Sequence, residues 1–491
     1  MSESKATAIT IQNYVENRLK ESLRAVANKS FLIKLLKLHH AFQYWKALGR
    51  ARYKGIDEFL SNIGEKYENQ KLSAVSYSEG DNAACYIIEL IIRNGYNTEE
   101  SILPSFDDIN MIFAYASLLY NIGMYLDVLY IRGEKARLRV LESGRFCFPL
   151  QEMDLFDRYF SKLREDGFDE LSKFRKKVEE LPQIDVDTKS PSFTKAFKEE
   201  YGFDYTTFHQ VINRCLELSF AQDVAIYVMT EEKFVNSFFS SNNIDCYNSF
   251  KKHFIMSKEA STGLDYSEFY PHRHNRLFQM STRPWVLYNN ELMFSYKSLY
   301  ISFSIFLERL SNGILRASSN EMKTYLGSVR EKKGLMFNQQ MYQLYSNLGI
   351  SNLKVFQGVK IGKGEMLDNE NSLGDIDLLL IDMISKKIVC IELKNYMESR
   401  SLWSVITQER ETKDDLKIVI KRNNWCQNHI QNFKVLINDN DDNKYDLKTV
   451  FITYNLQVHK YLNDEGTTDS QIVLMDVSQI IDAPLNIFNV F

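Results

Sequence analysis

Proline and glycine are scarce in this chain of 491 residues, which contains 7 prolines and 20 glycines. Because both residues interrupt helices, their scarcity favours a helix-rich structure. The 6 cysteines include no CxxC pair, so the usual pattern of a zinc ribbon is missing. Their scattered spacing suits a reducing compartment better than a disulfide-bonded secreted protein, and we expect a cytoplasmic location.

Long apolar runs are also missing. The longest uncharged run, Ile109 to Leu126, has eighteen residues, which is at the lower limit for a membrane span. Asn110, Ser117 and Asn121 lie within it and lower its hydrophobicity. We interpret the run as a buried core helix, and we expect no membrane contact. The polar segment Met1 to Thr10 lacks the apolar core of a secretory signal.

Neither sign of charge is in excess, because Lys plus Arg is 60, Asp plus Glu is 64, and the formal net charge is -4. This balance excludes a strongly basic protein that coats nucleic acid by bulk charge. An aromatic content of 13% argues against wholesale disorder. The sequence has no GxxxxGK(S/T) loop, so no NTPase motor is predicted.

The length suggests two to four domains at roughly 150 residues each. We expect a mostly helical N-terminal domain over residues 1–182 and a helical to mixed middle region over residues 192–330. The polar segment Pro182 to Pro191 between them is expected to be a linker. Strands alternate with helices after residue 330, which predicts an α/β domain over residues 331–491. The N-terminal helical region is the expected place for a protein partner or for self-association.

The last region contains two predicted helices, Leu335 to Leu348 and Thr412 to Ile437. Its apolar runs predict five strands: Leu353 to Phe356, Ile376 to Asp382, Ile388 to Leu393, Thr449 to Thr453 and Ile472 to Met475. In the middle region, Asn289-Asn290 separates two short apolar runs, which predicts a hairpin with a tight turn.

Charged residues at the ends of two predicted strands carry the most information. If Met383 to Lys386 form a four-residue loop, Asp382 pairs with Lys387, and counting back pairs Asp377 with Glu392. Opposed residues on neighbouring strands share a face at about 5 Å, so the two carboxylates would lie side by side. Lys394 is two residues after Glu392 and would lie on the same face. This hairpin predicts a compact cluster of two acids and one lysine.

Such a cluster fits metal-assisted hydrolysis of a phosphodiester. A divalent cation relieves the repulsion between Asp377 and Glu392 by taking oxygen ligands from both, and the backbone carbonyl of Leu393 is one further candidate ligand. The cation polarises the phosphate and lowers the pKa of a bound water. Lys394 is placed to orient that water or to stabilise developing negative charge.

Asp377 followed by a strand hairpin ending in Glu392-x-Lys394 resembles the PD-(D/E)xK nuclease superfamily, the restriction-endonuclease-like fold. The resemblance covers residues 331–491. It implies a mixed sheet flanked by helices, Asp377 and Glu392 as ligands of Mg²⁺ or Mn²⁺, and Lys394 as the catalytic lysine. Many members carry a Glu on the preceding helix, where this sequence has Asn338, which would offer only a neutral oxygen.

Two further groups are candidates for contacts with nucleic acid. The superfamily often places a polar residue on the helix after the site, and Lys417, Lys421, Arg422 and Gln427 lie on the predicted helix here. A basic cluster containing His272, Arg273 and Arg276 follows Tyr270 and is expected in a loop that could hold phosphates. A solvated helix face and an ordinary surface loop are the alternatives. His39-His40 is interpreted as a pair of core or surface histidines.

The sequence therefore predicts an Mg²⁺-dependent endonuclease acting on nucleic acid, most simply double-stranded DNA. Its large accessory region resembles that of effectors in bacterial anti-phage or restriction systems. The alternative is a catalytically weakened module with a nuclease fold that binds nucleic acid or a protein. Residues 331–491 hold 18 basic and 22 acidic side chains, so tight DNA binding by this region is expected only with metal.

Overall fold

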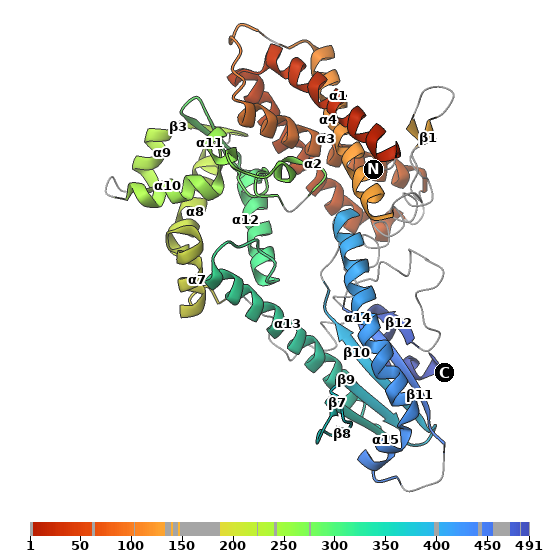
Figure 1. The fold of residues 1–491 in the computed structure, drawn as a ribbon. Coiled ribbons are helices and arrows are strands. Elements are labelled where there is room, and N and C mark those ends of the chain that lie inside the picture. The colour runs from red at the N-terminus through yellow and green to blue at the C-terminus, as the bar shows by residue number, and fades with distance from the viewer. Residues whose placement is uncertain are drawn as a thin grey trace. The chain divides into compact units, whose positions relative to one another are not determined.

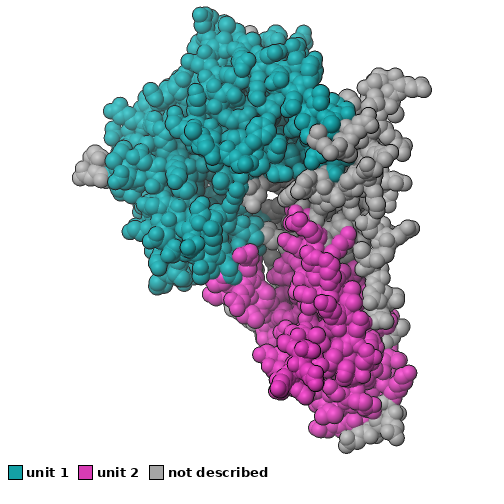
Figure 2. Space-filling view, in the orientation of Figure 1, with its two compact units in different colours: residues 1–135, 186–327 teal, residues 136–185, 328–491 magenta. Residues whose placement is uncertain are grey.

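The structure is a computed structural model. It describes residues 3–490 except for 61–63, 103, 133–138, 141–145, 148–186, 223, 240–242, 274–275, 397–401, 440–443, 455–471 and 482. The chain divides into two compact units, which Figure 2 colours separately. Unit 1 contains residues 1–135 and 186–327, and unit 2 contains residues 136–185 and 328–491. Half of the predicted linker at Pro182 to Pro191 lies outside the described residues, which resume at residue 187.

Four long helices form the first part of unit 1 (Figure 1): α1 (Glu3–Val26), α2 (Lys29–Leu60), α3 (Gly64–Asn94) and α4 (Phe106–Arg132). One apolar face of each helix contributes to a shared core. The mostly helical N-terminal part is thus confirmed.

Helix α4 contains the long uncharged run. The segment Phe106–Asp127 of this helix is long and apolar enough to cross a membrane, judged by length and composition alone. One third (33%) of its most apolar stretch is buried inside the protein. Four of its side chains at helical spacing enter the core of unit 1: Ile112, Ala116, Leu119 and Ile122. This face of α4 therefore packs in the core, as predicted for a core helix.

The second part of unit 1 combines helices with a small mixed sheet of strand order β3-β6-β5-β4. The strands are β3 (Tyr227–Thr230), β4 (Ile255–Met256), β5 (Trp285–Tyr288) and β6 (Glu291–Phe294). The helical elements are α7 (Pro191–Tyr201), α8 (Tyr205–Ala221), α9 (Glu231–Phe238), α10 (Ile244–Phe254), α11 (Lys258–Ser261), η2 (Tyr266–Phe269) and α12 (Tyr296–Ser311). The predicted hairpin is confirmed, and both turn residues, Asn289 and Asn290, have positive φ, as a tight hairpin turn requires.

The two parts of unit 1 share a core. Phe278 and Met293 belong to the same hydrophobic cluster as Leu19 and Leu32 from the N-terminal helices. A second cluster of buried aromatic rings lies among α7, α8, α10 and α12. The first 135 residues and residues 186–327 therefore fold together.

Unit 2 is built on a six-stranded mixed sheet of order β12-β11-β10-β9-β7-β8. Its strands are β7 (Leu353–Gly362), β8 (Leu367–Asp368), β9 (Gly374–Asp382), β10 (Lys387–Lys394), β11 (Asp446–Thr453) and β12 (Ile472–Asp476). β9 is antiparallel to β7 and β10, whereas β10, β11 and β12 are mutually parallel neighbours. All five strands predicted in this region are confirmed, and the short β8 is additional.

Helices cover both faces of this sheet. On one face, α13 (Asn320–Ser346), α16 (Ser478–Ile481) and η3 (Pro484–Val490) pack against inward side chains such as Leu378 and Ile391. On the other face, α14 (Leu402–Asn428) and α15 (Ile430–Leu436) pack against side chains such as Leu379 and Cys390 (Figure 1). A short ribbon of β1 (Arg139–Val140) and β2 (Phe146–Cys147) is also assigned to unit 2. The chain is thus a mixed α/β protein with a mostly helical N-terminal part.

Candidate active site

The hairpin of β9 and β10 has the register that the sequence predicts. Asp382 pairs with Lys387, and the pairing continues to Leu378 with Ile391. One further step along the same register sets Asp377 opposite Glu392. Cys390 belongs to the hydrophobic cluster on one face, while Val389 and Ile391 belong to the cluster on the other, as strand alternation requires.

Asp377 lies where the regular pairing of β9 with β10 ends and where its pairing with β7 is interrupted. β7 pairs with β9 through Gln357–Leu378 and Val359–Ile376 but omits the pair between Gly358 and Asp377, and Gly358 has a φ of 62°. The Asp377 carboxylate instead accepts a hydrogen bond of 2.7 Å from the Leu393 backbone N–H. Its second oxygen accepts one of 3.0 Å from the Asn338 side-chain nitrogen on α13. These two donors fix the orientation of the carboxylate.

Glu392 is held between two cationic side chains. Its Oε1 lies 3.0 Å from Lys394 Nζ, and its Oε2 accepts a hydrogen bond of 2.5 Å from Arg422 Nη1 on α14. Only 7% of the Glu392 surface is exposed. Arg422 also donates from Nε to the backbone oxygen of Leu373 at 3.1 Å, so its guanidinium is fixed at two points. A buried carboxylate needs such partners to remain charged.

The two acids influence each other. Burial, and next the Glu392 carboxylate, raise the pKa of Asp377 to about 7, although the Leu393 N–H opposes the shift. Burial alone would lower the pKa of Lys394, but Glu392 and Asp415 outweigh it and raise that pKa above its ordinary value. The raised pKa keeps Lys394 protonated. The negative charge of Asp377 is unfavourable in the folded protein, and a bound cation would relieve this.

Two residues near the site were not singled out from the sequence. Asp415 on α14 lies 3.7 Å from Lys394 and accepts a hydrogen bond from the Tyr396 hydroxyl. Asp415 and Glu392 are thus two acidic neighbours of Lys394, and they hold its ammonium group in place and favour its charged form. Asp415 is one of many polar residues on a long helix, so the sequence did not indicate that its side chain faces the sheet.

The residues predicted on the helix after the site differ in their surroundings. Lys417 and Lys421 are exposed, and Lys417 pairs with Asp414 at 2.7 Å. Gln427 donates a hydrogen bond of 2.9 Å to the backbone oxygen of Leu447, which anchors α14 to β11. Arg422, a predicted contact with nucleic acid, is buried beside Glu392, so in this arrangement its guanidinium is not open to a ligand at the helix surface.

The described residues of the basic cluster, His272, Arg273 and Arg276, do not form the accessible patch that was expected. His272 and Arg276 are 5% and 6% exposed. Arg276 forms a two-point ion pair with Glu89, with distances of 2.5 and 3.2 Å. His272 Nε2 lies 3.0 Å from an oxygen of Asp127, and Arg273 pairs with the same carboxylate at 3.4 Å. Arg273 and Arg276 pair with acids of the N-terminal helices, and His272 is buried against one of those acids. His272 and Arg276 are therefore not available to phosphate.

The site has the donor groups that a hard divalent cation prefers. Asp377 and Glu392 offer carboxylate oxygens from adjacent strands, and burial together with the Glu392 charge raises the pKa of Asp377. Asn338 contacts Asp377 through its nitrogen, so in this arrangement it orients the acid. The Leu393 carbonyl stays a predicted ligand. The arrangement can bind a cation beside a fixed ammonium group.

The comparisons with known proteins agree with one part of this interpretation. The chain matches the family described as anti-phage protein Upx-like over residues 80–435, well over half of its length. No curated protein and no solved structure is significantly similar to it. The matched segment includes Asp377, Glu392, Lys394 and Arg422. The chain therefore belongs to the Upx-like family of anti-phage proteins.

Proposed function

We propose that this defence protein is a metal-dependent nuclease, with its site on the β9–β10 hairpin of a restriction-endonuclease-like domain. The observation that carries the proposal is the convergence of Asp377, Glu392 and Lys394 in the register predicted from the sequence. A buried acid and a half-buried acid beside a half-buried lysine are costly for stability, and such clusters are typical of functional sites.

The order of elements supports this fold for unit 2. A helix, α13, precedes an antiparallel β7–β9–β10 segment, and α14 then connects β10 to the parallel strand β11. Helices lie on both faces of the sheet. Asp377, Glu392 and Lys394 lie on β9 and β10, the two central strands of the sheet.

Each side chain has a role in the proposed reaction. A bound Mg²⁺ or Mn²⁺ would supply Lewis-acid activation of the phosphate and of a water. Asp377, oriented by Leu393 and Asn338, and Glu392 would hold that ion. Lys394 keeps its proton, so it stabilises negative charge that develops on the phosphate and orients the attacking water.

Arg422 restrains the Glu392 carboxylate when no metal is bound. Its guanidinium occupies one oxygen of Glu392 and Lys394 occupies the other. A metal bound at Glu392 would therefore compete with these two cations for its carboxylate oxygens. Arg422, released from Glu392, would carry a planar group of donors suited to a phosphate.

Double-stranded DNA is the substrate we propose, since a nuclease in an anti-phage protein would degrade the invading genome. The test incubates the purified full chain with linear and supercoiled DNA, and with RNA in parallel, in Mg²⁺, in Mn²⁺ and in EDTA. Metal-dependent cleavage is expected for the wild type. Glu392→Ala and Lys394→Ala should each lower the rate at least a hundredfold.

Matched controls come from the exposed turn after β7. Glu365→Ala and Lys363→Ala remove the same kinds of charge there and should leave the rate within twofold. Cleavage that persists undiminished in Glu392→Ala and Lys394→Ala would refute this site. Cleavage of RNA alone would keep the site and change the substrate.

One observation favours a second function, a module that binds nucleic acid or a protein without cutting. Asn338 supplies no charge, and Arg422 already neutralises Glu392 without a metal. In that case the wild type would bind DNA but show no cleavage with either metal. Binding that is unchanged in Glu392→Ala would support this alternative.

A further inference from the structure

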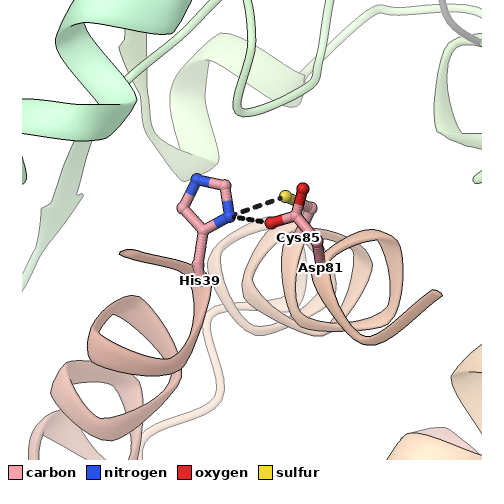
Figure 3. Close-up of side chains that lie close together, drawn as sticks. All are labelled: His39, Asp81 and Cys85. Atoms are coloured by element: carbon pink, nitrogen blue, oxygen red, sulfur yellow. Dashed lines mark hydrogen bonds and ion pairs between the residues drawn. The ribbon is translucent and has the colours of Figure 1, made fainter. Parts of the chain in front are cut away.

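The N-terminal helices bring together a second group of chemically active side chains, in unit 1. His39 comes from α2, and Asp81 and Cys85 come from α3, one turn apart on the same face of that helix. Figure 3 shows both α3 side chains directed at the same ring nitrogen of His39. The candidate ligand atoms of the three residues all lie within 4.8 Å of one another.

The convergence on a single nitrogen is the informative feature. His39 Nδ1 lies 2.6 Å from Asp81 Oδ1 and 3.3 Å from Cys85 Sγ. That nitrogen holds either one proton or one lone pair, so it satisfies only one partner at a time. A cation at the centre would instead take one lone pair from each of the three atoms.

The same geometry excludes a nucleophilic relay. In a Cys–His–Asp relay the thiol contacts one ring nitrogen and the carboxylate contacts the other, so that the ring passes a proton between them. Here the thiol and the carboxylate contact the same nitrogen. Cys85 is thus not arranged as an activated nucleophile.

We propose that His39, Asp81 and Cys85 form a zinc site that ties α2 to α3. A thiolate with an imidazole and a carboxylate suits Zn²⁺ and disfavours Mg²⁺ and Mn²⁺. Zinc bond lengths of 2.0 to 2.3 Å in tetrahedral geometry place ligand atoms about 3.3 to 3.6 Å apart. The nitrogen–sulfur distance of 3.3 Å must widen by roughly 0.2 to 0.3 Å, and the nitrogen–oxygen distance by roughly 0.7 Å.

The burial and charge of the site fit this ion. The side chains of His39 and Asp81 are 6% and 4% exposed. One Zn²⁺ with one thiolate and one carboxylate has no net charge, which lowers the cost of burying the group. Gln43, one turn after His39, donates a hydrogen bond to the other oxygen of Asp81 and so orients the carboxylate. Water would fill the fourth position.

The test uses Co²⁺ as a spectroscopic substitute for zinc on the full-length, metal-stripped chain. We expect one Co²⁺ per chain with the absorption bands of a tetrahedral thiolate complex, displaced by one equivalent of Zn²⁺. Cys85→Ala should abolish the thiolate band, and Asp81→Asn should weaken Co²⁺ binding at least tenfold. Zn²⁺ should raise the unfolding temperature of the wild type and not of Cys85→Ala.

Control variants separate this site from general effects and from the proposed nuclease site. Cys246→Ala removes another free thiol and should keep the thiolate band. Glu392→Ala should keep it too, and excess Mg²⁺ should not displace Co²⁺. Absence of a thiolate band from the folded wild type, or its persistence in Cys85→Ala, would overturn the proposal. Circular dichroism of metal-free Cys85→Ala should match the wild type, so that loss of binding is not loss of fold.

Discussion

Asp377→Asn should stabilise the protein when no divalent metal is present. Asp377 is mostly buried beside Glu392, and this surrounding raises its pKa from 3.8 to about 7. Ionised Asp377 is therefore a cost to the folded state. The new amide keeps one acceptor for the Leu393 N–H, and Asn338 can turn its own amide to accept from the new NH₂ group.

The size of the effect follows from the pKa shift. One pKa unit corresponds to about 1.4 kcal/mol, so the full shift sets an upper bound of roughly 4 kcal/mol. Asp377 is not fully buried and water screens part of the repulsion, so we expect about 2 kcal/mol at pH 8.

The dependence on pH has a definite sign. Below pH 4 both the folded and the unfolded state hold the proton, and the charge costs nothing. As the pH rises from about 4 to about 7, the unfolded chain ionises first, so wild-type stability falls. Above pH 7 the cost is constant. The advantage of Asp377→Asn should therefore grow between pH 4.5 and pH 8.

Urea denaturation in EDTA at pH 4.5, 6 and 8 measures this difference. Asp375→Asn, which changes an exposed acid two residues earlier, is the matched control and should change stability by less than about 0.5 kcal/mol. Saturating Mg²⁺ should stabilise the wild type and not Asp377→Asn. An Asp377→Asn protein that is less stable than the wild type at pH 8, or an advantage equal at every pH, would refute the reasoning.

Two other perturbations test unit 1. Arg276→Met leaves the Glu89 carboxylate buried without its partner and should cost about 3 to 5 kcal/mol by urea denaturation, whereas a cost below 1 kcal/mol would contradict the importance of the pair. His253 is buried against Tyr201, and burial lowers its pKa to about 4. As the pH falls below 6.5, the unfolded chain binds a proton at this histidine before the folded chain does, so the folded state loses stability. His253→Phe should remove about 2 kcal/mol of the loss between pH 7.5 and pH 5, while a change at the exposed His209 should not.

Local patterns predicted the parts of the fold that depend on neighbours in sequence. The β9–β10 hairpin followed from two alternating apolar runs and a short loop, and the β5–β6 hairpin followed from Asn289-Asn290. These features need no distant partner. The same logic gave the shared face of Glu392 and Lys394, which is a property of any strand.

Distant pairs account for what the sequence did not reveal. Arg276 pairs with Glu89, which lies 187 positions away in the sequence, and no local sequence pattern predicts such a partner. Arg422 is different, because a signal was present: Val419 and Cys426 are buried at helical spacing around it, which places Arg422 on the face toward the sheet. His39 looked like one histidine of a pair on an apolar face, and only the packing of α2 on α3 brought Asp81 and Cys85 to it.

The central position of β10 bears on how the protein is synthesised. One edge of β10 is closed by the adjacent β9, but the other is closed by β11, which begins only at Asp446. Until that strand leaves the ribosome, the apolar segment from Ile388 to Leu393 presents an open edge that can pair with other chains. A truncation after residue 428 should therefore aggregate and not yield a small independent hairpin. Assembly of the strands that carry Asp377 and Glu392 thus waits until β11 has been synthesised.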